Sequence, residues 1–192
     1  MATAAAYDEI ADWYEHEFLG ATDTGHADPL GLGDLITELL GEGTGTCLEI
    51  GCGTGVHAAR VRALGRTPVG VDLSAGMLGH AHARLPVARA DAERLPFRDG
   101  SLPAVLAVMT HTDMPGYLDG HWTTDSWTDQ GLRDKVGATH RPLPELLHAF
   151  LDAGLTPERF AESGGATPLV LATRARSAAG TAAGTGTAPG RR

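Results

Sequence analysis

Three glycines alternate with other residues along one short segment, at Gly51, Gly53 and Gly55. A strand is predicted just before the segment, over residues 46–50, and a helix just after it. Glycine lets the backbone turn sharply and approach a ligand without side-chain collision. A strand that leads through such a turn into a helix is typical of sites for adenosine-containing cofactors. The dinucleotide pattern G-x-G-x-x-G would need glycine at position 56, where this chain has Val56, so the spacing disfavours a tightly held pyrophosphate.

Acidic residues accompany the ends of three predicted strands. Glu49 comes just before the first glycine, Asp72 ends the strand predicted over 68–72, and Asp91 follows the one predicted over 86–90. A carboxylate about 20 residues beyond the glycines can accept both ribose hydroxyls, and Asp91 can accept from an adenine amino group. Repulsion from three carboxylates would penalise a nucleotide diphosphate. The pattern therefore predicts a neutral or cationic nucleoside ligand and disfavours a nicotinamide oxidoreductase.

The elements that position these residues follow from the apolar periodicity. Helices alternate with strands in the middle of the chain, and the four strands are predicted over residues 46–50, 68–72, 86–90 and 104–109. Ser74 is the expected cap of one helix, and Gly65 the expected end of another. This alternation predicts an α/β fold with a Rossmann-like, doubly wound and mostly parallel sheet.

Further elements flank this central part. Amphipathic helices are predicted over residues 7–18 and from Asp28-Pro29 to Gly41. Near the other end, a helix stopped by Gly154 is expected to precede two short strands, over 158–161 and 169–172.

Three sequence blocks carry a family resemblance: E-I-G-C-G-T-G at 49–55, V-D-L-S at 71–74 and D-A-E-R-L-P-F at 91–97. Their order and spacing resemble the class I S-adenosylmethionine-dependent methyltransferases of the type 11 branch. The resemblance implies S-adenosylmethionine as cofactor and methyl transfer to a small-molecule acceptor as function. It implies that Glu49 and the glycine turn hold the methionine end, that Asp72 holds the ribose, and that Asp91 with Ala92 holds the adenine. The full set of expected cofactor residues is Tyr7, Tyr14, Glu49, Gly51, Cys52, Gly53, Thr54, Gly55, Asp72, Leu73, Met77, Asp91 and Ala92.

The same resemblance suggests how the chain is organised. The N-terminal helix with Tyr7 and Tyr14 resembles a lid over the methionine moiety, although Trp13 on that helix is better read as a core residue. We expect one methyltransferase-like domain over 1–174 and a disordered, Ala- and Gly-rich tail over 175–192. Within the domain we expect lid helices (1–41), a cofactor-binding half (46–109), an irregular acceptor-side loop (110–142) and a C-terminal helix with strands (143–174).

The family pattern breaks after the fourth strand. The helix, turn and fifth strand that should follow are not readable between residues 110 and 142, where apolar residues are scattered. We therefore expect a sheet that is incomplete after strand four, with a block deleted near Met114-Pro115. The final strands, or a piece of 115–141, would then pair beside strand four. The break also leaves open an alternative function, a catalytically inactive remnant that still binds the cofactor.

Candidate catalytic residues follow the fourth strand, at the edge where ligands of open α/β sheets bind. Methyl transfer needs a base only if the acceptor atom carries a proton of high pKa. His111 is the first candidate base and Asp113 the second, and an ordinary polar loop is an equally good reading of His111. His140 is a weaker candidate. The histidines of the central helices, namely His57, His80 and His82, are expected to face away from the strand ends.

The composition of the chain limits the partners and the cellular compartment that are expected for it. The net charge is −9 and no arginines cluster before the tail, so a nucleic-acid partner is not expected. No apolar run approaches the ~20 residues of a membrane span, and residues 1–7 show no secretory signal. Cys47 and Cys52 lie too close together for a useful disulfide and lack partners for a zinc site, which favours a reducing cytoplasm.

Overall fold

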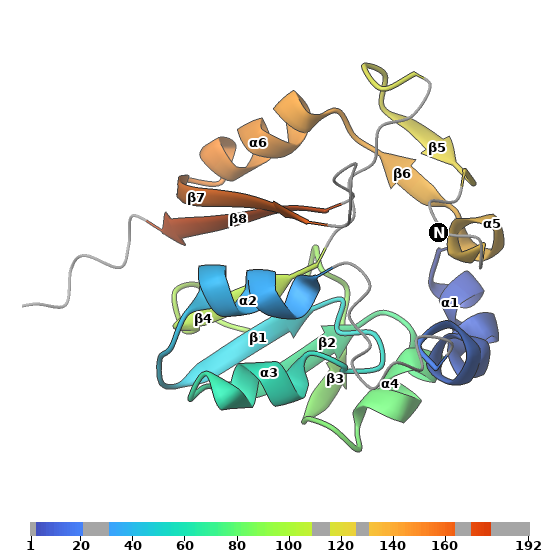
Figure 1. The fold of residues 1–192 in the computed structure, drawn as a ribbon, viewed down its shortest axis with the longest axis horizontal. Helices are drawn as coiled ribbons and strands as arrows, with labels where there is room; N and C mark the ends of the chain where they lie inside the picture. The colour runs from blue at the N-terminus through green and yellow to red at the C-terminus, as the bar shows by residue number, and fades with distance from the viewer. Residues whose placement is uncertain (1–2, 21–30, 109–115, 126–130, 164–169, 178–192) are drawn as a thin grey trace, which may run out of the picture.

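A parallel four-stranded sheet forms the centre of the molecule (Figure 1). The computed structural model describes residues 3–20, 31–108, 116–125, 131–163 and 170–177. The strand order is β3-β2-β1-β4, and the strands are β1 (Thr46–Ile50), β2 (Thr67–Asp72), β3 (Val87–Arg89) and β4 (Ala104–Ala107). The chain passes from β1 outward to β3 and then returns to the other side of β1. The predicted α/β fold with a parallel sheet is confirmed, and the reversal makes the carboxyl ends of β1 and β4 the expected place for a ligand.

Two short helices, α3 (Ala58–Ala63) and α4 (Ala75–Ala81), connect the first three strands. Their apolar residues and the glycine turn form one buried cluster, made of Cys52, Ala58, Leu78, Ala81 and Leu85. The predicted cap of α4 is confirmed, because the Ser74 hydroxyl accepts a hydrogen bond from the Met77 N–H. The turn that carries the motif is therefore anchored in the core.

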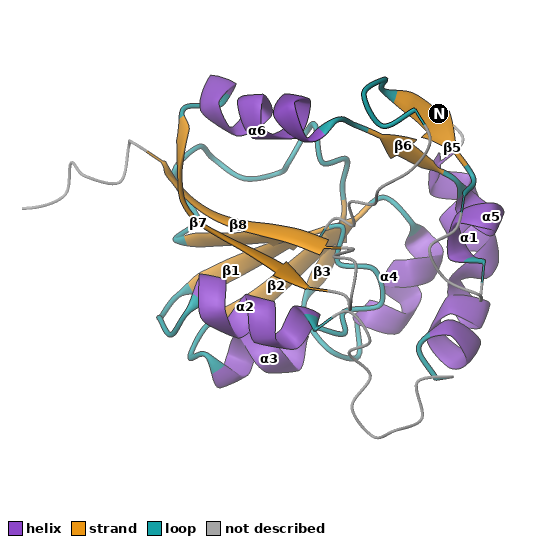
Figure 2. Ribbon diagram, turned by 45° about the horizontal axis from the view of Figure 1, so that its top comes forward, coloured by secondary structure: helices purple, strands orange, loops and turns teal. Residues whose placement is uncertain are grey.

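The N-terminal segment lies beside α4. It consists of α1 (Thr3–Trp13) followed by a π-helical turn, η1 (Tyr14–Phe18), and Figures 1 and 2 both show α1 next to a later helix, α5 (Leu132–Val136). The next helix, α2 (Leu32–Leu40), begins after Gly31, which has a left-handed φ of 67°. The predicted start at Asp28-Pro29 lies outside the described residues.

The chain after β4 differs from expectation. The stretch expected to be an irregular loop over 110–142 holds α5 and an antiparallel pair of strands, β5 (His121–Thr123) and β6 (Ala138–His140). These elements have three to five residues each, too few for a period to be visible in the sequence. The prediction of a wholly irregular loop is therefore wrong.

The C-terminal part forms a separate layer. Helix α6 (Leu143–Asp152) is followed by an antiparallel hairpin of β7 (Leu155–Ser163) and β8 (Val170–Ser177), which packs on α2 through Val170 and Leu35 (Figure 2). Both strands are longer than predicted, and β8 extends past the expected start of the tail at residue 175. Ion pairs from Arg174 and Arg176 to Glu158 accompany the pairing of these two strands.

The outer edge of β4 has no neighbouring strand among the residues that the structure describes. The prediction that the final strands, or a piece of 115–141, pair beside strand four is wrong, because the described strands there pair within their own hairpins. Val105 in β4 is 52% exposed. In the described part of the chain, no helix combines the length and apolar character needed to cross a membrane.

Candidate functional site

The glycine turn after β1 contains two kinds of glycine. Gly51, Gly53 and Gly55 all have left-handed φ angles, of 67°, 52° and 79°. A Cβ at Gly55 would lie 2.5 Å from a methyl carbon of Leu85, so this glycine is required by packing. A Cβ at Gly51 or Gly53 would meet nothing within 4 Å, so open space lies in front of both. The backbone at these two positions is therefore accessible to a ligand.

Asp72, at the end of β2, holds this turn in place. The Gly53 N–H donates to its Oδ2 over 2.9 Å, and the Ser74 N–H donates to its Oδ1 over 2.8 Å. Each carboxylate oxygen can accept more than one hydrogen bond. Asp72 can thus fix the glycine turn and still accept bonds from a ligand.

Glu49 lies in the middle of the sheet, on β1, and is only 2% exposed. The Nδ1 of His57 lies 2.7 Å from its Oε1, whereas its Oε2 is buried without a hydrogen-bond partner among the described residues. A buried carboxylate oxygen without a partner is costly, and a bound cation would relieve it. The expectation that His57 faces away from the strand ends is wrong, because the turn before α3 brings its ring back onto Glu49.

Two tyrosines of the N-terminal segment are influenced by these carboxylates. Burial is the main cause that raises the pKa of the Tyr14 hydroxyl to about 12, and the charges of Asp72 and Glu49 contribute to the rise. Burial likewise raises the pKa of Tyr7, again with a contribution from Asp72. Both tyrosines are therefore close enough to feel the charges of the strand ends.

Side-chain contacts fasten this segment to the body of the domain. Asp8 accepts hydrogen bonds from the Ser74 hydroxyl and, over 3.0 Å, from the Gly76 N–H at the start of α4. In η1, Glu15 pairs with Arg84, whose Nη1 also donates to the Thr54 carbonyl over 2.7 Å. Arg84 thus links the segment directly to the glycine turn.

The pair of Glu15 and Arg84 makes a testable contribution to the stability of the fold. The hydrogen bonds from Arg84 are the main cause that holds the pKa of Glu15 below its usual value. Its stabilising effect is therefore present above about pH 4.5 and is lost as the pH falls through the lowered pKa. We expect Glu15→Gln to lower the free energy of unfolding by about 1–2 kcal/mol at pH 7, because a partly buried charged pair is broken. The difference from the native chain should shrink below about pH 4 in urea titrations followed by circular dichroism.

Glu17→Gln is the matched control, since Glu17 lies in the same turn and is exposed. It should change the free energy of unfolding by less than about 0.5 kcal/mol. Equal effects of the two substitutions at pH 7 would contradict the role given to the Glu15–Arg84 pair.

Comparison with known proteins identifies this arrangement. Residues 47–119 match the family model described as the methyltransferase domain. This segment of the chain is therefore similar to a methyltransferase domain. The matched segment begins in β1 and includes the glycine turn, Asp72 and the region after β4. No protein of curated function matches the chain.

Solved methyltransferases share the fold of this domain. An S-adenosylmethionine-dependent methyltransferase from Mesorhizobium loti has a TM-score of 0.57 and 18% identity, over 76% of this chain and 97% of that one. A structure of DhpI with S-adenosylhomocysteine also has a TM-score of 0.57 and 18% identity, over 92% and 95%. Geranyl diphosphate C-methyltransferase from Streptomyces coelicolor A3(2) has a TM-score of 0.51 and 18% identity, over 69% and 61%.

S-adenosylmethionine or S-adenosylhomocysteine is named with each of these three structures, and the strand ends of this chain have features that suit S-adenosylmethionine. The unpartnered Oε2 of Glu49 suits an ammonium group, and the open space at Gly51 and Gly53 admits a ligand against the backbone. Neither feature is explained by packing within the domain. The acidic residue at the end of β2 adds an acceptor for hydroxyl groups.

The remaining expected cofactor residues differ in how far they are exposed. Leu73, Asp91 and Ala92 are exposed beside the strand ends, and the Asp91 Oδ1 accepts from the Glu93 N–H over 3.0 Å. Met77 is 2% exposed and lies in the core. Cys52 and Thr54 are also buried. Burial raises the pKa of the Cys52 thiol to about 12, which makes it a packing residue rather than a nucleophile.

The structure gives less information on the candidate catalytic residues than on the expected cofactor residues. His111 and Asp113 lie outside the described residues. His140 is buried at the hairpin of β5 and β6, where its Nε2 lies 2.8 Å from the Tyr117 carbonyl oxygen, so it has a structural partner. His82 is exposed at the end of α4.

Sequence reasoning missed Arg133 of α5. This side chain is buried, and burial is the main cause that lowers its pKa. It interacts electrostatically with Tyr7, so it lies near the N-terminal segment that covers the strand ends. No local signal in a five-residue helix could have placed this guanidinium there.

Proposed function

We propose that this methyltransferase domain moves a methyl group from S-adenosylmethionine to a small-molecule acceptor. The observation that carries the proposal is the buried, unpartnered Oε2 of Glu49 beside the open backbone of Gly51 and Gly53. A cationic amino acid moiety complements both features at once. The family match over residues 47–119 supports the same reading.

Each strand end has one task in this proposal. The Glu49 carboxylate accepts hydrogen bonds from the ammonium of the methionine moiety, and Asp72 accepts from the ribose hydroxyls with its remaining lone pairs. Asp91 and Ala92 recognise the adenine, and the exposed apolar side chain of Leu73 gives it a surface to lie on. When bound, S-adenosylmethionine supplies a methyl group on a sulfonium, and the thioether S-adenosylhomocysteine leaves when the bond from sulfur to the methyl carbon breaks. The domain then has to orient the partners and exclude water.

The N-terminal segment is well suited to exclude water. Tyr7 and Tyr14 are partly buried and influenced by Asp72, which supports a position over the strand ends for both. The contacts of Asp8 and Glu15 with the body keep them there. We therefore assign residues 3–18 as the lid.

The acceptor is expected to be small and not polyanionic. The net charge of −9 repels a nucleic acid, and the carboxyl end of β4 leads toward His111 and Asp113. His111 is the proposed base and Asp113 the second choice, needed only for an acceptor whose proton has a high pKa.

A second candidate function is a remnant that binds the cofactor without turnover. The outer edge of β4, which lacks a neighbour among the described strands, favours it, because that edge belongs to the acceptor side. The two candidates share the cofactor site and differ only in catalysis.

Calorimetry tests the site that both candidates share. We expect S-adenosylhomocysteine to bind the purified chain at one equivalent and NAD to give no binding heat, because the carboxylates repel a diphosphate. Binding of NAD with equal affinity would overturn the cofactor assignment.

Turnover then separates the two candidates. A panel of phenol, amine and carboxylate acceptors with S-adenosylmethionine should yield S-adenosylhomocysteine with at least one class. If S-adenosylhomocysteine binds but no acceptor is methylated, the remnant is the better description.

A further inference from the structure

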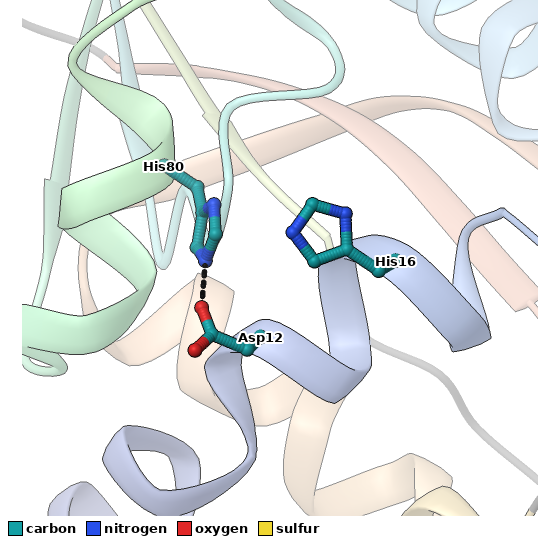
Figure 3. A group of neighbouring side chains, drawn as sticks. All are labelled: Asp12, His16 and His80. Atoms are coloured by element: carbon teal, nitrogen blue, oxygen red, sulfur yellow. Dashed lines mark hydrogen bonds and ion pairs between the residues drawn. The ribbon is translucent and has the colours of Figure 1, made fainter.

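Three potential metal ligands meet at the junction between the lid and α4 (Figure 3). Asp12 in α1 and His16 in η1 are four residues apart on the lid, and His80 is on α4. Their ligand atoms all lie within 4.8 Å of one another. The junction thus gathers two imidazoles and a carboxylate from segments that are far apart in the sequence.

The geometry is close to that of a transition-metal site. Zinc binds nitrogen and oxygen ligands at about 2.0–2.2 Å, so neighbouring ligand atoms in a tetrahedral site lie about 3.3 Å apart. The Nε2 of His80 and the Oδ1 of Asp12 are already 2.8 Å apart. The rings of His16 and His80 meet edge to face with centroids 5.7 Å apart. His16 is exposed, so its ring has room to turn toward the other two ligands.

The surroundings are favourable for a cation. The nearby Arg84 is paired with Glu15, so its positive charge is already balanced. The Asp12 side chain is 91% exposed, so water can complete a coordination sphere with three protein ligands.

We infer that Asp12, His16 and His80 form a binding site for a divalent transition metal of the zinc class. Two imidazoles and one carboxylate suit Zn²⁺, Co²⁺ or Ni²⁺ better than Mg²⁺ or Ca²⁺, which prefer oxygen ligands. A metal bound there joins the lid to α4. The site is separate from the proposed methyl-transfer chemistry and stands on its own contacts.

Titration with Co²⁺ tests the site, because tetrahedral or five-coordinate Co²⁺ has strong visible absorption. The chain should be prepared without a histidine tag, treated with a chelator and then titrated with Co²⁺, and Zn²⁺ should displace the signal. We expect one equivalent of Co²⁺ to bind to the native chain. His16→Gln and His80→Gln should each weaken the affinity at least tenfold, and a tenfold excess of Mg²⁺ should not compete.

His82→Gln is the matched control, since His82 is an exposed histidine two residues beyond His80. It should bind Co²⁺ as the native chain does. If His80→Gln unfolds the lid, Asp12→Asn provides a second test, because it keeps the shape of the side chain and should still weaken Co²⁺ binding. Equal Co²⁺ affinity of the native chain, His16→Gln and Asp12→Asn would overturn the inference and leave Asp12 and His80 as an ion pair only.

Discussion

Replacing Asp72 with alanine is expected to reduce the affinity for S-adenosylhomocysteine at least about 100-fold. In the proposed site this carboxylate accepts from two ribose hydroxyls, and hydrogen bonds to a charged group contribute about 1.5–3 kcal/mol each. Because about 1.4 kcal/mol corresponds to a factor of ten, two lost bonds account for that decrease. Isothermal titration calorimetry of the variant and the native chain measures it. Asp99→Ala, which removes one exposed carboxylate from a turn, should bind S-adenosylhomocysteine normally.

The same substitution also removes the acceptor for the Gly53 and Ser74 N–H groups, so the turn itself could loosen. A ligand lacking the 2′-hydroxyl separates the two effects, in the manner of a double-mutant cycle. Loss of that hydroxyl should weaken binding to the native chain by about tenfold or more, and should make little further difference to Asp72→Ala. An unchanged affinity of Asp72→Ala for S-adenosylhomocysteine would show that the ribose is held elsewhere.

The features that could be predicted from the sequence are those set by local rules. The glycine turn, the strand before it and the Ser74 cap depend on a few adjacent residues, and the structure has all three. The central strand β1 is buried on both faces, which is why its hydrophobic run was readable. The parallel order followed from the alternation of helices and strands.

The features that could not be predicted depend on tertiary contacts. His57 was expected to face away, yet the path of the turn carries its ring onto Glu49. The pairing of Glu15 with Arg84 joins residues 69 positions apart, and no periodicity encodes it. The strands β5 and β6 have three residues each and are specified by their partners rather than by a pattern of their own. The acceptor side is therefore the part of the chain whose structure depends least on local sequence patterns.

Gly55→Ala is expected to cause a large loss of stability, about 2–5 kcal/mol. The left-handed φ of 79° strains any residue with a Cβ, at about 1–2 kcal/mol. The new methyl group would also lie 2.5 Å from a carbon of Leu85 and 3.4 Å from the Cβ of Ala81. Both neighbours are buried in the core cluster, so neither can move aside easily, and overpacking adds about 1–3 kcal/mol. Urea unfolding followed by circular dichroism measures the total against a stability of about 5–15 kcal/mol.

Two matched glycines show whether packing or backbone strain dominates this loss. At Gly79 in α4 a Cβ meets nothing within 4 Å and the φ is not positive, so Gly79→Ala should raise the free energy of unfolding by about 0.5–1 kcal/mol. At Gly51 the φ is positive but the space is open, so Gly51→Ala should lose only the strain of about 1–2 kcal/mol. Because its methyl group would project into the space proposed for the cofactor, it should also weaken S-adenosylhomocysteine binding more than its loss of stability suggests. A Gly55→Ala chain as stable as Gly51→Ala would mean that Leu85 yields, and that Gly55 is needed for its backbone conformation alone.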